Sequence, residues 1–531
     1  MAAPISSGGT FIREIGLALP GLAAGLARVV RLSYRERLGR PFALEIDFVA
    51  PDGVVEPSKI LGRPVAATLQ MPDGGRRHLH GIASELRCIH RRGEDEPFAY
   101  RVSVESWLGM LRLRRWSRWF QDKNALEILA AVFRATGQTA YEVMAIDAPP
   151  TREFRAQHDE TDLDFVLRTA EHDGLYSFWR HAADRHTLVL CDSFANHGPF
   201  PGAETLVYDP DESAEGVREV VTSWDFRHRL VSESVTSDDY NYRLASTSLA
   251  ATEQVLGAST LDGAAEYHFP AGVFTHDEAR RDARLRSEAI ACEALVYEGS
   301  SNSLKIAAGY QIRLQGFPVS GDNGEFLVTT AHLEIDAASA GDAAAFAHRC
   351  TFEAIPCARQ FRPQRLTPKP LAAGVHSAFV HAPEGQPPTQ PYADGMARLQ
   401  VTIPWNRGGD PSCWIRVSQL LAGHRWGALH LARSGNEVLV GFEHHDIDRP
   451  VILGCVYNGD HLPPVLLPDA AGVSIIKDPS GNFIALNPIP SEPTITLSSP
   501  WKSTSIMIGG THPNDSSIGG AGPPDVAVQS H

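Results

Sequence analysis

The sequence feature that most constrains the fold is an eleven-residue repeat near the C-terminal end of the chain. In each repeat two apolar residues flank one residue of any kind. The pairs are Val473 and Ile475, Ile484 and Leu486, Ile495 and Leu497, and Ile506 and Ile508. Because residues two apart on a strand point to the same face, the repeat predicts four short stacked strands of a β-prism or β-helix, each with two apolar side chains on one face.

One chain cannot close a hydrophobic core with two apolar residues per strand. Three copies could do so by turning these faces towards a common axis, so the repeat predicts a homotrimer. Beyond Ile508 the register fails, because Ser517 and Gly519 occupy the next positions and Gly and Pro become frequent. We therefore expect the stack of strands to end there and its exposed end to be covered by another protein.

Length and composition exclude several classes of protein. The 531 residues predict three or four domains, at roughly 150 residues per domain. Hydrophobic residues make up 43% and charged residues 21%, which is typical of a folded, soluble protein. The net charge of −15 argues against nucleic acid as a partner. Seven scattered cysteines without a CxxC pair favour reduced thiols. The first apolar run, 17–30, is too interrupted for a signal peptide or a membrane span.

Strand, helix and turn signals divide the rest of the chain. The pattern predicts a mainly β protein with an α/β insert. We expect the following parts: 1–120 a first β-barrel, 121–220 the α/β insert, 221–360 a second β-barrel, 361–395 a Pro-rich linker, 396–460 a small OB-like barrel, and 461–531 a short needle with a Gly- and Pro-rich tip. Helices are expected over 124–136 and 161–173, the second with Thr161 as its N-cap, and from Thr275 through Cys292.

Several ordered motifs resemble the VgrG family, the spike proteins of the bacterial type VI secretion system, which are similar to the hub and spike proteins of contractile phage tails. The motifs of the expected hub are Leu38-Gly-Arg-Pro-Phe42, Ile60-Leu-Gly-Arg-Pro64, Thr161-Asp-Leu-Asp-Phe-Val166 and Gly324-Glu-Phe-Leu-Val-Thr329. The OB block carries the most specific likeness. Its motif residues are Trp414, Arg416, Trp426, Gly427, Gly435, Glu437, Phe442, Arg449, Pro450, Gly454, Tyr457 and Asn458. The block departs from the family pattern at Ala432, His445 and Ile447, where proline, glycine and proline are usual.

The resemblance implies a mechanical role. It implies a fold of two hub β-barrels, an OB-fold barrel and a trimeric β-helix or β-prism needle. Three copies would cap a hexameric inner tube, contact the baseplate, puncture the target envelope in transient contact with its membrane, and deliver effectors bound at the tip. A tip protein of the PAAR kind, or an effector or adaptor, would cover the needle end. The protein would be cytoplasmic during assembly and exported without a signal peptide.

An enzymatic role finds no support in compact motifs. The sequence contains no GxSxG, HExxH or GxxxxGK[ST] motif, so we expect no catalytic residue and no cofactor. His78 and His80 alternate along a strand, and His444 and His445 lie near two aspartates. Adjacent strand residues point to opposite faces, so we favour a solvated loop over a metal site.

The stretch 111–119 is basic and aromatic, which could indicate binding of single-stranded nucleic acid. We favour a structural interpretation, with Leu111, Leu113 and Trp116 inward and Arg112 and Arg114 outward, where an acidic neighbouring subunit is a better partner than nucleic acid. Two alternatives to a type VI spike stay open. One is a phage-tail or phage-like extracellular injection spike. The other is a spike with hidden cell-wall lytic or glycan-binding activity.

Overall fold

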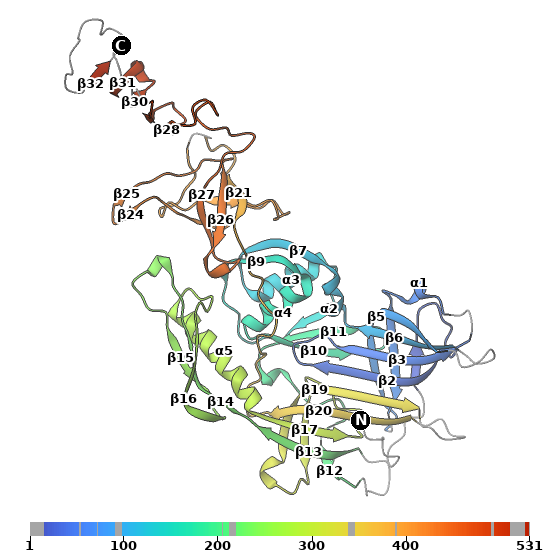
Figure 1. The fold of residues 1–531 in the computed structure, drawn as a ribbon. Helices are drawn as coiled ribbons and strands as arrows, with labels where there is room; N and C mark the ends of the chain where they lie inside the picture. The colour runs from blue at the N-terminus through green and yellow to red at the C-terminus, as the bar shows by residue number, and fades with distance from the viewer. Residues whose placement is uncertain are drawn as a thin grey trace, which may run out of the picture. The chain divides into compact units, whose positions relative to one another are not determined.

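A computed structural model describes residues 15–51, 55–71, 73–90, 98–203, 205–211, 219–337, 346–387, 390–489, 493–509 and 526–529. Its contacts divide the chain into two compact units, 1–370 and 371–531. The first unit contains the expected hub, and the second contains the OB-like barrel and the needle (Figure 1).

Twelve hub strands form one continuous sheet, in the order β1-β4-β5-β6-β3-β2-β19-β18-β12-β13-β17-β20. Their bounds are β1 Ile15–Ala18, β2 Arg28–Arg37, β3 Ala43–Ala50, β4 Pro64–Gln70, β5 Arg76–His90, β6 Phe98–Glu105, β12 Leu206–Tyr208, β13 Val220–His228, β17 Leu295–Ser301, β18 Gln311–Gln315, β19 Gly324–Ala337 and β20 Phe346–Pro356. A short helix, α1 (Pro57–Ile60), precedes β4.

The two expected barrels are therefore two halves of one sheet. They join where β2 pairs antiparallel with β19, with Tyr34 opposite Leu333 and Leu32 opposite Ile335 (Figure 1). Pairing of β19 with β20 closes the six strands of the second half into a ring. Within the described residues no pairing joins β1 to β2, so the first half stays open. Leu32 and Ile335 belong to one hydrophobic core shared by both halves.

The α/β insert follows β6 and packs its apolar helix faces into the same core. Its elements are α2 Trp107–Met110, η1 Leu111–Leu113, β7 Arg115–Lys123, α3 Ala125–Ala135, β8 Tyr141–Val143, β9 Arg152–Thr161, α4 Asp162–His172, β10 Tyr176–His181, β11 His186–Cys191 and η2 Phe194–Asn196. The predicted N-cap of α4 is confirmed, because the Thr161 side chain accepts a hydrogen bond from the Asp164 backbone N–H. Asn124 and Glu127 form a capping box at α3.

A second insertion, in the second half of the hub sheet, consists of a small sheet and a long helix. The sheet order is β15-β14-β16. The bounds are β14 Leu230–Ser237, η3 Tyr242–Leu244, β15 Ala251–Gln254, β16 Ser259–His268, α5 His276–Ala294 and, after it, η4 Ser320–Asp322. Helix α5 begins after its N-cap Thr275, as predicted, and packs against β14 and β15 (Figure 1).

In the second unit, five strands form the OB-like sheet in the order β22-β21-β26-β27-β23. The bounds are β21 His376–His381, β22 Gln400–Thr402, β23 Arg416–Val417, β24 Ala422–Gly423, β25 Trp426–Gly427, β26 Glu437–Phe442, η5 Glu443–His445 and β27 Pro450–Cys455. Strand β21 pairs with β22 and β26, so it belongs to the barrel. It falls within 361–395, where the sequence predicted a linker, because prolines on either side of it hide a six-residue strand.

The needle is an antiparallel sheet in which consecutive strands are neighbours. Its elements are β28 Ser474–Lys477, β29 Phe483–Asn487, β30 Thr494–Ser499, η6 Trp501–Ser503, β31 Thr504–Ile508 and β32 Val526–Gln529. The expectation that the stack ends after Ile508 is wrong, because β32 pairs with β31. Its Val526-Ala-Val528 pattern lies outside the eleven-residue spacing and so escaped the sequence register. Ser517 and Gly519 lie outside the described residues.

Across the described part of the chain, no helix combines the length and the apolar character needed to cross a membrane.

Candidate functional site

Three of the four predicted needle pairs share one face of the sheet. Ile484 of β29 lies opposite Leu497 of β30, which in turn lies opposite Ile506 of β31. In the same way, Leu486 lies opposite Ile495, which lies opposite Ile508. We call these six residues the needle face.

The needle face is open to solvent in the single chain. Ile484, Leu486, Ile495 and Leu497 are 40–50% exposed. The side chains between them, such as Thr496, point to the other face of the sheet. A contiguous apolar face of this kind marks an interaction surface in a soluble protein.

The first predicted pair does not belong to this face. Strand β28 begins at Ser474, so Val473 lies before it, and Ile475 is opposite Ala485. Ile476, which is 61% exposed, lies opposite Ile484 instead. A register shift of one residue reverses the face of every side chain on a strand. The β28–β29 turn sets this register, because the Asp478 carboxylate accepts hydrogen bonds from the backbone and side chain of Asn482.

The OB motif residues tie together the ends of the barrel strands. Arg416 of β23 pairs with Glu443, and the Glu437 carboxylate at the start of β26 accepts from the Asn458 amide at 2.8 Å. Arg449 lies 3.9 Å from Asp446. Trp414 packs against Tyr392 in a tilted arrangement, and Gly435 has φ +81° in the turn before β26. In the β26–β27 pairing, Phe442 is opposite Pro450 and Gly454 is opposite Leu439. Tyr457 is exposed. Trp426 and Gly427 lie apart from them, on the hairpin β24–β25.

The loop that departs from the family pattern has an unusual backbone. His444 and His445 both have positive φ, +53° and +59°, and both are exposed. Glycine adopts this conformation without strain, which agrees with the glycine that the family usually has at the position of His445. In the described part of the chain no group of three His, Cys, Asp or Glu side chains is placed to hold a metal ion.

The basic stretch 111–119 pairs with acidic groups of its own chain. Arg112 pairs with Glu105, and Arg114 and Arg118 both contact the buried carboxylate of Asp162. The inward orientation predicted for Leu113 and Trp116 is wrong, since these side chains are 74% and 36% exposed. The cause is the 3₁₀ turn η1, which interrupts the strand alternation assumed for this stretch.

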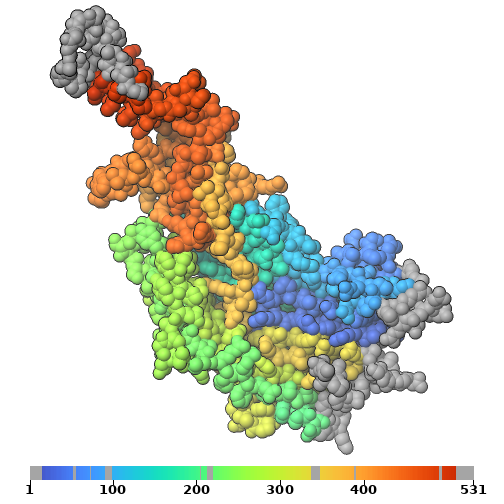
Figure 2. Space-filling view, in the orientation of Figure 1, coloured from blue at the N-terminus to red at the C-terminus, as the bar shows by residue number. Residues whose placement is uncertain are grey.

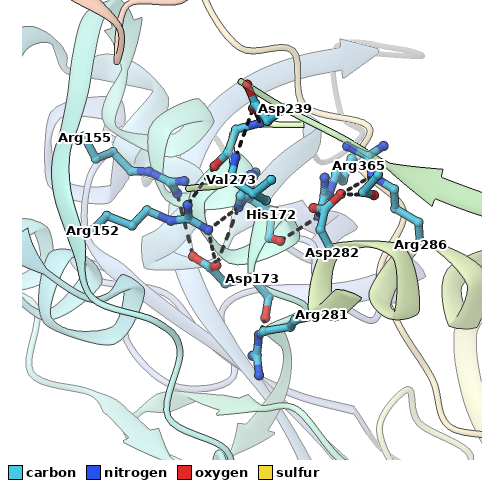
Figure 3. A network of polar contacts seen from close by, with 12 residues as sticks. Arg152, Arg155, His172, Asp173, Asp239, Val273, Arg281, Asp282, Arg286 and Arg365 are labelled. Carbon is cyan, nitrogen blue, oxygen red and sulfur yellow. Dashed lines mark hydrogen bonds and ion pairs between the residues drawn. The ribbon is translucent and has the colours of Figure 1, made fainter. Parts of the chain in front are cut away.

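A buried polar network fixes the segment that leaves the hub (Figure 3). We call residues 359–367 the strap. Arg362 pairs with Glu288 of α5 at 2.6 Å, and Arg365 donates to Asp282 of the same helix at 2.5 Å. Thr367 donates its N–H and its hydroxyl to the two carboxylate oxygens of Glu171 in α4. The first part of the predicted linker is therefore docked on the hub.

The charges of this network stabilise each other. Burial alone would raise the pKa of Asp282, but Arg365 and Arg286 hold it far below its ordinary value. Burial likewise opposes the ionised form of Asp173, yet Arg152 at 2.8 Å keeps the pKa of that carboxyl low. Burial and the neighbouring arginines lower the pKa of His172, so its ring is neutral at pH 7. Sequence reasoning missed this network because its members lie on elements distant in the chain.

A hub sheet, an OB-like barrel and a needle sheet with an open apolar face together define the hub-and-spike class of contractile-tail proteins. Residues 35–339 match the family model of the phage tail baseplate hub. Residues 390–457 match that of the type VI secretion system/phage-baseplate injector OB domain. The chain belongs to the VgrG family of type VI secretion system spike proteins.

Among its relatives, the Pseudomonas aeruginosa spike protein VgrG1a is 30% identical over 459 residues, which are 85% of this chain and 70% of the relative. VgrG1b of the same organism is 30% identical over 86% of this chain, and this chain spans 62% of its length. A component of the Escherichia coli type VI secretion system has the same fold, with a TM-score of 0.60 at 20% identity over 83% of this chain and 99% of that one. A chain of the Francisella PdpA–VgrG complex also has this fold. Its TM-score is 0.64 at 7% identity, over 99% of this chain and 90% of that one.

Proposed function

We propose that this protein is the homotrimeric, non-enzymatic spike and hub of a type VI secretion system. The observation that carries the proposal is the needle face. Six apolar side chains stand in register on three strands, and no other part of the described chain is packed over them to bury them. Three such faces around one axis would bury each other, which is the closed symmetry that the repeat predicts.

The mass of the particle in solution tests the trimer. Three chains of 57.8 kDa give about 173 kDa by light scattering or native mass spectrometry. An obligate interface of this kind buries roughly 2,000 Å² or more, so the trimer should persist at micromolar concentration. A monodisperse monomer at that concentration would contradict the proposal.

The trimer would work at the end of an inner tube. Each hub contributes two six-stranded halves, so three chains would present six similar units to a hexameric tube protein and to the baseplate. Sheath contraction would then drive the spike from the cytoplasm through the target envelope. The names of the relatives favour a type VI machine over a phage-like injection system. Co-purification with the tube protein of the same genome tests this contact.

Cargo or a tip protein would occupy the needle end. A VgrG relative has been solved in complex with PdpA, which supports a spike that carries a second protein. We propose that a PAAR-type tip protein, an effector or an adaptor binds through residues 509–531. Deleting 509–531 removes β32 but keeps the six residues of the needle face, so it should leave the trimer intact and abolish capture of the tip protein in a pull-down. Loss of the trimer in this deletion would instead assign those residues to assembly. A hydrolysis assay of the purified trimer on cell-wall polymers tests the lytic alternative.

A further inference from the structure

The hairpin 418–430 of the OB-like barrel presents large apolar side chains to solvent. Strands β24 and β25 pair only with each other, and the hairpin projects from the rest of its unit (Figures 1 and 2). Leu420 is 90% exposed, Trp426 64% and Leu429 65%. Three apolar side chains this exposed on one short hairpin indicate a contact surface.

The Trp426 side chain packs against its own hairpin. A Cβ atom at Gly423 would lie 2.3 Å from the Trp426 ring, so the indole is in direct contact with the glycine. At the base, the Gln419 side-chain oxygen accepts from the His430 N–H at 2.9 Å, and the Ala428 N–H donates to Leu421 at the same distance. An aromatic side chain held in place before binding loses little entropy on binding, which favours it as an interface anchor.

A second apolar surface of the same unit is the outer face of the OB sheet. Phe379 of β21 is 38% exposed, and Leu453 of β27, which lies across Gly441, is 49% exposed. Glu437 of β26 is directly opposite Phe379 on this face. Its hydrogen bond from Asn458 lowers the pKa of the Glu437 carboxyl, so the face carries a negative charge beside its apolar residues.

The two surfaces carry opposite charges. The hairpin tip carries His424 and Arg425 next to Trp426, and both are exposed. The hairpin of a chain leaves its own Phe379 and Leu453 uncovered, so the complement of this face comes from another molecule. A contact between two different surfaces of identical chains is heterologous, and it closes into a ring when the rotation permits.

We propose that the hairpin of one copy packs on the outer face of the OB sheet of a second copy, with Trp426 against Phe379 and Leu453 and Arg425 beside Glu437. This inference rests on the proposed trimer. It adds a contact between neighbouring OB-like barrels that is independent of the needle face. In this contact the hairpin of each chain packs on one neighbour, and its OB sheet binds the hairpin of the other neighbour.

Engineered cysteines test the contact in the full-length protein. In a C88S/C455S background, which removes the two exposed native cysteines, W426C and L453C are combined and treated with a short bis-maleimide. We expect cross-linked dimers and trimers on a denaturing gel for the double variant and monomers for each single variant. A double variant that stays monomeric on the gel while light scattering shows a trimer would overturn the contact and leave the proposed function standing. A parent protein that is itself a monomer would overturn both.

A charge exchange tests the same contact without cysteines. R425E should lower the denaturant concentration at which the trimer dissociates, and E437R combined with R425E should restore it. The matched control is R407E, because Arg407 is exposed in the same unit and lies on neither surface. If R425E behaves like R407E, the pairing with Glu437 is wrong. If R425E keeps the trimer but loses a co-purifying protein, the hairpin binds that protein, and the second copy is excluded as its partner.

Discussion

Arg365, in the strap that leaves the hub, donates a hydrogen bond to a carboxylate oxygen of Asp282 at 2.5 Å. Asp282 also accepts from Arg286 and from the Ser237 hydroxyl, so one buried carboxylate joins the strap, α5 and β14. Removing one member of a buried pair leaves the other charge without compensation. These contacts hold the strap on the hub, which suits the proposed mechanical role of the spike.

Asp282→Ala should therefore destabilise the protein strongly. We expect a loss of about 3–5 kcal/mol in the free energy of unfolding, because Arg365 and Arg286, each only 21% exposed, lose the buried carboxylate that they share. Denaturant unfolding of the full chain measures it. The control is Glu325→Ala, which breaks the exposed pair with Arg313 and should cost less than about 1 kcal/mol. Equal losses in the two variants would show that the strap pair contributes no more than a surface pair.

Glu36 should make stability depend on pH. Its carboxyl is buried in the hub core, where it accepts hydrogen bonds from the Tyr34 hydroxyl and the Ala308 N–H. Burial raises its pKa to about 7, although Arg77 opposes the shift. Since the folded state holds this proton more tightly than the unfolded state, the contribution of Glu36 is fully present below about pH 4.5. It is lost as the pH rises towards 7.

The variant Glu36→Gln stays neutral at every pH and isolates this effect. Thermal unfolding of both proteins between pH 5 and pH 8 measures it. We expect the difference in stability between the natural protein and the variant to move in favour of the variant as the pH rises. A difference that is constant across this range would show that the pKa of Glu36 is the same in the folded and unfolded states.

Gly309 occupies a position that no other residue fits. Its φ is +86°, and a Cβ atom there would lie 2.4 Å from Phe178. Gly309→Ala should lower the free energy of unfolding by about 3 kcal/mol or more, since the cost of backbone strain adds to the cost of the steric overlap. Gly137→Ala is the matched control, because Gly137 has φ +72° and open space around it. Gly137→Ala should lower the free energy of unfolding by about 1 kcal/mol, because only the backbone is strained. Similar losses would mean that Phe178 moves aside.

Local signals in the sequence predicted the local structure well. Thr161 and Thr275 cap their helices as predicted because a cap depends only on residues within one turn. Three of the four needle pairs share a face as predicted, because the alternation of side chains between the two faces is a local property of a strand. The fourth failed because a hydrogen-bonded turn, at Asp478 and Asn482, shifted the register.

Long-range pairing escaped the sequence analysis. The pairing of β2 with β19 brings Tyr34 next to Leu333, and neither strand has a sequence signal that predicts which strand it pairs with. The sequence predicts a linker from residue 361 because Pro363, Pro368 and Pro370 signal extended chain, while the residues that hold the strap lie on α4 and α5. Arg365 and Asp282 are ordinary surface types in the sequence, and only the fold shows that Asp282 is buried and paired with Arg365.

The needle face gives the sharpest test of assembly. In the double variant Ile495→Asp and Leu497→Asp, each layer of a trimer would bring three carboxylates to a dry axis, at a cost of several kcal/mol for each unpaired charge. We expect this variant to be a monomer by light scattering. The control is Thr496→Asp, which places one carboxylate on the same strand but on the opposite face, and it should leave the trimer intact. A trimer in both variants would show that the needle face does not lie at the axis. A monomer in both would show that β30 tolerates no added charge on either face.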